Sequence, residues 1–207
     1  FPNLGDAGAA KYQYSKGNFC NTAEFSLPLT DKALITFGFT GTDTENPTTT
    51  RKSGADSAVQ PAMTKAFNTS SDIARLRVTE TDEDGLSTDF KSLTFTLNNN
   101  VSPEKVLGTL GAKYINTGNF EVDIEAQMLF TNGDVVTKIR DNETVTMDFV
   151  VRNGDGGIAV DVPAMTMGGG DREFPVNETV LVNVTAMAFA DPVLGTSLGI
   201  SVFPVLP

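Results

Sequence analysis

The sequence predicts a mostly β protein, because apolar side chains recur with a period of two far more often than with the helical period of about 3.6. Threonine and glycine are also abundant along the 207-residue chain. Such alternation is typical of strands that bury one face and leave the other in water. A chain of this length buries about 70% of its surface on folding, so we expect a single domain over residues 1–207.

The clearest predicted strand covers residues 120–130, about 36 Å of chain at ~3.3 Å per residue. Its even-numbered positions are apolar, whereas Glu121, Asp123 and Glu125 fall on the opposite face. These carboxylates repeat about every 7 Å along the strand, a spacing at which they repel one another and favour solvent. They therefore predict an ordinary solvated face or, as a functional alternative, an acidic surface that resists adhesion.

Six further strands show the same alternation. They are predicted over residues 33–40, 72–81, 93–97, 144–151, 180–186 and 198–202. In the run over residues 72–81, strict alternation places Ile73 on the same face as Arg75 and Arg77. The strands over residues 93–97 and 144–151 are expected to be half buried.

One short helix is predicted over residues 134–140. Val135 and Ile139 are four positions apart, and the basic side chains of this segment lie at the negative end of the helix dipole. Asn142 is expected to close the helix in the left-handed conformation.

Three segments are predicted as turns. Residues 102–105 begin like a helix, but Gly108 and Gly111 follow too soon for one to continue. Residues 153–157, Asn-Gly-Asp-Gly-Gly, predict a hairpin, and the glycine-rich residues 168–171 predict another turn.

Residues 41–71 show neither period and predict a long inserted loop. A loop of this length inside a compact domain indicates either disorder or a segment that is ordered by a partner. Arg51, Lys52 and Lys65 make it locally basic within an acidic protein. Solvated loop charges are the plain interpretation of these residues.

The composition excludes several classes of function. The net charge of −11 argues against a surface that wraps nucleic acid or binds an anionic membrane. Histidine is absent, which removes the Ser-His-Asp and Cys-His arrangements and the histidine metal sites. The single cysteine, Cys20, cannot form an internal disulfide. We therefore expect no catalytic site and no cofactor.

Metal and membrane binding are not expected either. Residues 80–91 begin like a calcium loop, but Lys91 stands where a bidentate glutamate is needed. No apolar run approaches the ~18 residues of a membrane span. The opening residues 1–6 lack the basic and apolar regions of a signal peptide.

A series of short sequence segments in the second half of the chain resembles a known family. They cover residues 93–101, 107–111, 117–122, the helix from Asp134, and 195–204. In their order and spacing, these segments resemble those of the major tail tube proteins of long, flexible-tailed bacteriophages (siphoviruses), in particular the flagellotropic Chi-like group.

The resemblance implies a tail-tube-type β-sandwich or partial barrel with one short flanking helix and a long extended loop. It also implies hexameric rings that stack into a helical tube, with tail tip and terminator proteins as further partners. DNA would pass through the lumen without specific binding, and the protein would lie in the virion tail after assembly in the host cytoplasm. Glu121, Asp123 and Glu125 are expected to face the lumen. The loop, with Arg51, Lys52, Gln60 and Lys65, is expected to dock on a neighbouring subunit. Opposite charges between stacked rings would help fix their register, with solvated loop charges as the alternative.

Two other functions are compatible with the residues. An extracellular or surface β-sandwich module for adhesion or carbohydrate binding would share the alternating threonine-rich and asparagine-rich strands. Such a module would usually show a signal peptide, a calcium site or exposed aromatic residues. A hydrolase that uses two carboxylates is the third alternative, although no pair of acidic residues is marked out.

Overall fold

The computed structural model describes residues 11–55, 63–79, 89–129, 134–173 and 179–204. Most of them lie in strands, and the described part of the chain has one α-helix, so the predicted mostly β fold is confirmed. Internal contacts divide the chain into two compact units. Unit 1 comprises residues 1–22, 37–63 and 99–119, and unit 2 comprises residues 23–36, 64–98 and 120–207. The expected single domain stays a prediction.

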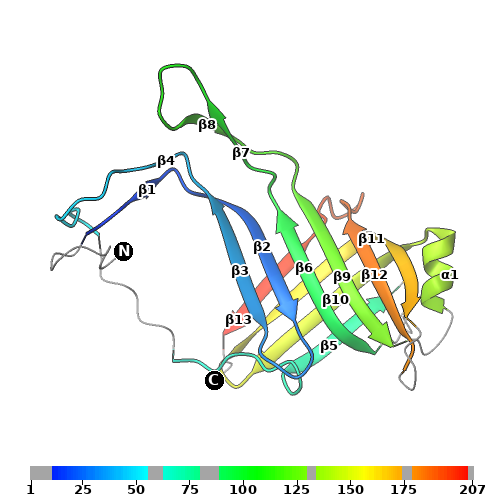
Figure 1. Ribbon diagram of the computed structural model, residues 1–207. Coiled ribbons are helices and arrows are strands. Elements are labelled where there is room, and N and C mark those ends of the chain that lie inside the picture. The colour runs from blue at the N-terminus through cyan, green and yellow to red at the C-terminus, as the bar shows by residue number, and fades with distance from the viewer. Residues whose placement is uncertain (1–10, 56–62, 80–88, 130–133, 174–178, 205–207) are drawn as a thin grey trace. The chain divides into compact units, whose positions relative to one another are not determined.

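A nine-stranded sheet forms most of unit 2 and curls into a half-barrel (Figure 1). Its strand order is β3-β2-β6-β9-β12-β11-β10-β5, and β13 pairs with β11 beside this path. The strands are β2 (Phe19–Leu27), β3 (Leu34–Thr40), β5 (Ile73–Thr79), β6 (Phe90–Asn98), β9 (Glu121–Leu129), β10 (Thr144–Asn153), β11 (Gly156–Glu173), β12 (Leu181–Ala188) and β13 (Gly199–Pro204).

The core lies on the concave side of this sheet and is built from alternate residues of its strands. Phe95 of β6 is 1% exposed, and its ring meets Phe25 and Phe149 edge-on at centroid distances of 6.3 and 6.2 Å. Val122 and Ile124 of β9 are equally well buried. Burial of one such side chain contributes about 1.5–3 kcal/mol, so the alternation fixes which face of each strand turns inward. The burial predicted for β6, β9 and β10 is confirmed, except at Phe120, which precedes β9 and is 48% exposed.

The structure confirms the helix, α1 (Asp134–Asp141), and its closing residue. Asn142 has a φ of 51°, the left-handed conformation expected there. The hairpin predicted over residues 153–157 is also confirmed, because Asn153 pairs with Gly156 at the β10–β11 turn.

The turn predicted over residues 168–171 is wrong, because these residues lie inside the continuous strand β11. Gly169 and Gly170 have φ values of 80° and 82°, and the register against β12 shifts between Gly169 and Asp171. The glycines therefore form a bulge, which inserts an extra residue and leaves the strand direction unbroken.

Residues 102–105 form a strand, β7, instead of the predicted turn. In unit 1, β7 (Ser102–Lys105) pairs with β8 (Ala112–Asn116), and the reversal comes later, around Gly108 with its φ of 85°. Proline is tolerated in β7 because a two-stranded ribbon has only edge strands.

The face predicted for Ile73 is also wrong. A register irregularity on β5 between the partners of Val150 and Val151 moves Ile73 to the core side, where it packs against the core as Leu76 does. Strict alternation cannot anticipate such a bulge.

Candidate functional site

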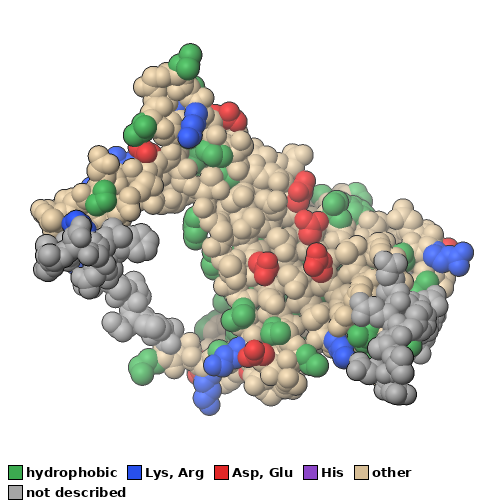
Figure 2. Space-filling model, in the orientation of Figure 1, with side chains coloured by type: hydrophobic (Ala, Val, Ile, Leu, Met, Phe, Trp, Pro, Cys, Tyr) green, Lys and Arg blue, Asp and Glu red, His purple; other side chains and the backbone are tan. Residues whose placement is uncertain are grey.

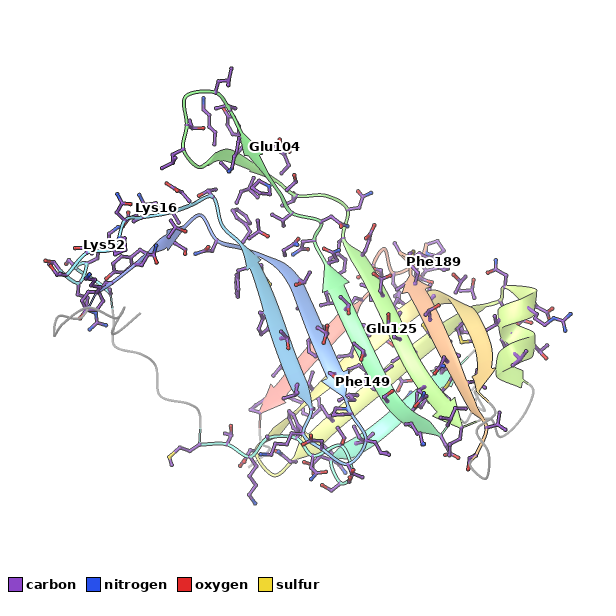
Figure 3. The ribbon with its side chains drawn as sticks, in the orientation of Figure 1. Lys16, Lys52, Glu104, Glu125, Phe149 and Phe189 are labelled. Atoms are coloured by element: carbon purple, nitrogen blue, oxygen red, sulfur yellow. The ribbon has the colours of Figure 1, made fainter. Side chains whose placement is uncertain are left out.

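The three carboxylates predicted on one face of β9 lie together on the side of the strand that faces away from the core. Glu121 and Glu125 are exposed and Asp123 is half buried, while the residues between them are core residues. Figure 3 labels Glu125 on this outer side and Phe149 in the interior. The sequence alternation therefore placed these side chains on the correct face of the strand.

Uncharged side chains flank the carboxylates on both neighbouring strands. On β6, Asn98, Thr96 and Thr94 lie opposite Glu121, Asp123 and Glu125 in the ladder. On β12, Thr185 lies opposite Glu125 and Met187 lies opposite Asp123. None of these cross-strand partners is basic, so the negative charges are not neutralised across the strands.

A shallow groove runs along this face. Its lining residues are Thr96, Asp123, Ile124, Glu125, Thr166, Met167, Gly168, Thr185, Ala186 and Met187. Figure 2 shows acidic side chains (red) spaced over the middle of the visible face, and no lysine or arginine (blue) is visible between them. The described residues hold no cluster of three or more histidine, cysteine or acidic side chains that could bind a metal ion. The arrangement is suited to repelling a polyanion, since exposed charges act over about a Debye length of ~8 Å.

Glu24 is a fourth carboxylate that the sequence reasoning missed. It is exposed on β2, between the core residues Ala23 and Phe25, and β2 lies beside β6 in the sheet. Alternation within residues 19–27 was the signal that could have found it. We call Glu24, Glu121, Asp123 and Glu125 the acidic face.

The loop residue Lys52 binds within its own unit. Its ammonium pairs with Glu45 and lies 5.1 Å from the centre of the Tyr14 ring, and its backbone N–H donates to the Tyr14 hydroxyl at 3.0 Å. Lys16 pairs with the same carboxylate at 2.7 Å. Hydrogen bonds from Lys16 and then Lys52 lower the pKa of Glu45, and the bond to Glu45 raises the pKa of Lys16. Figure 3 labels both lysines.

This ion-paired group closes a small ribbon in unit 1. Its strands are β1 (Ser15–Lys16) and β4 (Asp43–Thr44), and a further bridge joins Tyr12 to Thr48. The first part of the predicted loop is therefore ordered by its own chain.

The other predicted loop residues are not brought together with Lys52. Lys65 lies in unit 2, where its backbone N–H donates to Asp155 at 2.8 Å and its carbonyl accepts from Asn153 at 3.0 Å. Arg51 is exposed, and it forms no ion pair within the described residues. Gln60 lies outside the described residues, as does most of the rejected calcium pattern over residues 80–91.

A second charged cluster, on β5 and β10, is internally balanced. Asp148 is 16% exposed and pairs with Arg75 and with Arg77, the latter at 2.8 Å. Asp161 lies opposite Asp148 in the β10–β11 ladder. Burial and then the charge of Asp148 raise the pKa of Asp161.

Comparison with known proteins identifies one family. The model of that family, described as phage tail tube protein, matches residues 2–188. No curated protein matches the chain. Among the described residues there is no helix long and apolar enough to cross a membrane. The family match favours the tube hypothesis over the adhesion module and the hydrolase.

Proposed function

Because this chain belongs to the phage tail tube protein family, it is a structural component of a phage tail, and we propose that it builds the tube from stacked hexameric rings. The observation that carries the proposal is the family match over residues 2–188. The phage is of the long, flexible-tailed, Chi-like type, and tail tip and terminator proteins cap the tube. The subunits assemble in the host cytoplasm without a cofactor or a catalytic step, and each chain acts as one domain.

In this proposal the acidic face lines the lumen, with Glu121, Asp123 and Glu125 at its centre. Each chain carries a net charge of −11, and duplex DNA carries about one negative charge per 1.7 Å. A basic wall would bind phosphates and slow ejection, whereas an acidic wall keeps DNA from adhering. The neutral threonines and asparagine opposite these carboxylates leave their charge free to act in this way.

The loop over residues 41–71 contacts the neighbouring ring through Arg51, Lys52, Gln60 and Lys65. Lys52 is already paired with Glu45, so the exposed Arg51 supplies the main attraction between subunits. The charge reversal Arg51→Glu should lower the salt concentration at which tubes fall apart. Lys113→Glu, at an exposed lysine of β8, is the control with the same change in charge. Equal behaviour of the two variants would count against this role for the loop.

Tube formation is tested by negative-stain electron microscopy of the purified chain, alone and with tail-tip seeds. The expected result is long hollow cylinders. Material that stays dispersed under every seeding condition would contradict the proposal.

The lining of the tube is tested by the triple variant Glu121→Lys, Asp123→Lys, Glu125→Lys. Tubes of this variant should retain short duplex DNA in a sedimentation assay, and added salt should release it. The matched control reverses three exposed carboxylates elsewhere, Asp89→Lys, Glu104→Lys and Asp141→Lys. Equal DNA retention by the two triple variants would contradict the assignment of the acidic face to the lumen.

A further inference from the structure

The hairpin turn between β10 and β11 contains a chemically labile dipeptide, Asn153-Gly154. Asparagine is among the thermolabile residues. A glycine that follows it has no side chain to shield its backbone nitrogen, so that nitrogen can attack the asparagine side chain. Gly154 is exposed, and a Cβ built on it would meet no atom of the described residues within 4 Å. Water therefore has free access to this turn.

The Asn153 side chain also holds the end of the long loop over residues 41–71. Its Nδ2 donates to the carbonyl oxygen of Lys65 at 3.0 Å, and its Oδ1 accepts from the backbone N–H of Asp155 at 2.8 Å. The Asp155 carboxylate accepts from the backbone N–H of Lys65 at 2.8 Å. Two side chains of the turn thus satisfy both backbone polar groups of Lys65. We call these three hydrogen bonds the Lys65 clamp.

The chain that follows Lys65 is fastened independently of the clamp. The carbonyl oxygen of Phe67 accepts from the backbone N–H of Ala33 at 2.9 Å, and the Phe67 side chain packs against the core. Release of Lys65 would therefore loosen residues 64–66 and leave the chain from Phe67 onward in place.

We propose that Asn153 is a site of spontaneous deamidation and that the reaction opens the Lys65 clamp. The backbone nitrogen of Gly154 forms a bond to Cγ of Asn153, and the bond from Cγ to Nδ2 breaks. The proton of the Gly154 N–H passes through water to the departing nitrogen, which leaves as ammonia. Water then opens the cyclic imide and gives aspartate or isoaspartate at this position.

Neither product has the donor that the clamp requires. The amide that donated to Lys65 is replaced by a carboxylate, which accepts hydrogen bonds and cannot donate to the Lys65 carbonyl when ionised. The new negative charge also lies two residues from the Asp155 carboxylate, and like charges repel. In the intact chain the clamp restrains the amide of Asn153, so the reaction requires the turn to open first.

Storage of the purified chain at mildly alkaline pH tests the site itself. Asn153 should deamidate faster than Asn183, which is half buried in β12 and is followed by the branched residue Val184. Cleavage by trypsin after Arg152 and Arg172 places the two asparagines in different peptides, so mass spectrometry measures both rates in one sample.

Three variants test the link between the site and the clamp. Gly154→Ala shields the attacking nitrogen in a place where a methyl group fits, so deamidation should slow several-fold. Asp155→Ala removes the acceptor for the Lys65 N–H, so deamidation should become about fivefold faster, as expected for the loss of one hydrogen bond. Asn153→Asp reproduces one product, and trypsin should cut the folded variant after Lys65 about fivefold faster than the wild type. Cleavage after Lys113, an exposed lysine of β8, is the control and should not change.

Each outcome supports or overturns one part of the proposal. Deamidation of Asn153 that is no faster than that of Asn183, or that Gly154→Ala does not slow, would overturn the site. Deamidation that Asp155→Ala leaves unchanged would overturn the restraint by the clamp. Equal cleavage after Lys65 in Asn153→Asp and the wild type would show that the reaction does not open the clamp.

Discussion

Gly157 lies under the ring of Phe203, and its replacement by alanine tests how β13 is held on β11. A Cβ on Gly157 would lie 2.2 Å from Cε2 of Phe203 and 2.9 Å from the carbonyl oxygen of Val151. Neither atom is a flexible chain end, so the ring and the strand must move. Overpacking of this kind typically costs about 1–3 kcal/mol. We expect Gly157→Ala to lower the free energy of unfolding by that amount and to increase hydrogen exchange in β13.

The control is Gly199→Ala, at the other end of the same ladder. A Cβ there would lie 3.8 Å from the Cβ of Asp161, an ordinary contact, so the expected change is within about ±0.5 kcal/mol. A double-mutant cycle with Phe203→Ala isolates the energetic contribution of the contact with the Phe203 ring. In that background Gly157→Ala should cost less, with a coupling energy of about 0.5–3 kcal/mol, and the contact with Val151 should account for the remainder. Chemical denaturation of the unassembled chain measures all four free energies. An equal cost in both backgrounds would refute the contact.

Three further predictions concern stability. Phe95→Ala should lower the free energy of unfolding by about 3–5 kcal/mol, because its ring is buried between two others, whereas Phe120→Ala, at a 48% exposed ring, should cost far less on the same denaturant curves. Burial raises the pKa of Asp161, so its ionisation opposes folding and stability should fall as the pH rises above the ordinary value of 3.8. Asp161→Asn should remove that fall in a pH series of thermal unfolding, and an unchanged slope would contradict the assignment. Lys16 lowers the pKa of Glu45, so the ionised carboxylate should stabilise the β1–β4 ribbon fully at pH values above its ordinary pKa of 4.5. This stabilisation should be lost as the pH falls through the lowered pKa. Glu45→Gln should then speed hydrogen exchange in the ribbon near pH 7, and exchange equal to the wild type would exclude the ion pairs as its support.

The sequence predicted the local geometry of the acidic face well, because alternation along a strand is a property of neighbouring residues. It put Glu121, Asp123 and Glu125 on one side of β9, and the structure agrees. Alternation within residues 19–27 could have shown that Glu24 points away from the core, but not that it joins the other carboxylates, because that depends on the order of strands, which places β2 beside β6. Strand order depends on contacts between distant segments, and one sequence carries little information about it.

The errors arose where one residue changes the register. Glycine-rich residues 168–170 have the composition of a turn, yet they form a bulge because β12 continues to pair on both sides of them. The irregularity on β5 likewise moved Ile73 to the core side. The exposure of apolar side chains such as Phe37 on β3 and Val202 on β13 could not be predicted either, since alternation indicates which face is apolar but not whether anything covers it.

The central claim is that the chain assembles into a hollow tube with an acidic wall. Cryo-electron microscopy of the assembled tube tests it most directly. The expected map shows stacked sixfold rings with Glu121, Asp123 and Glu125 facing the bore. A bore lined by lysine and arginine, or an assembly in which β9 lies on the outer surface, would contradict the account.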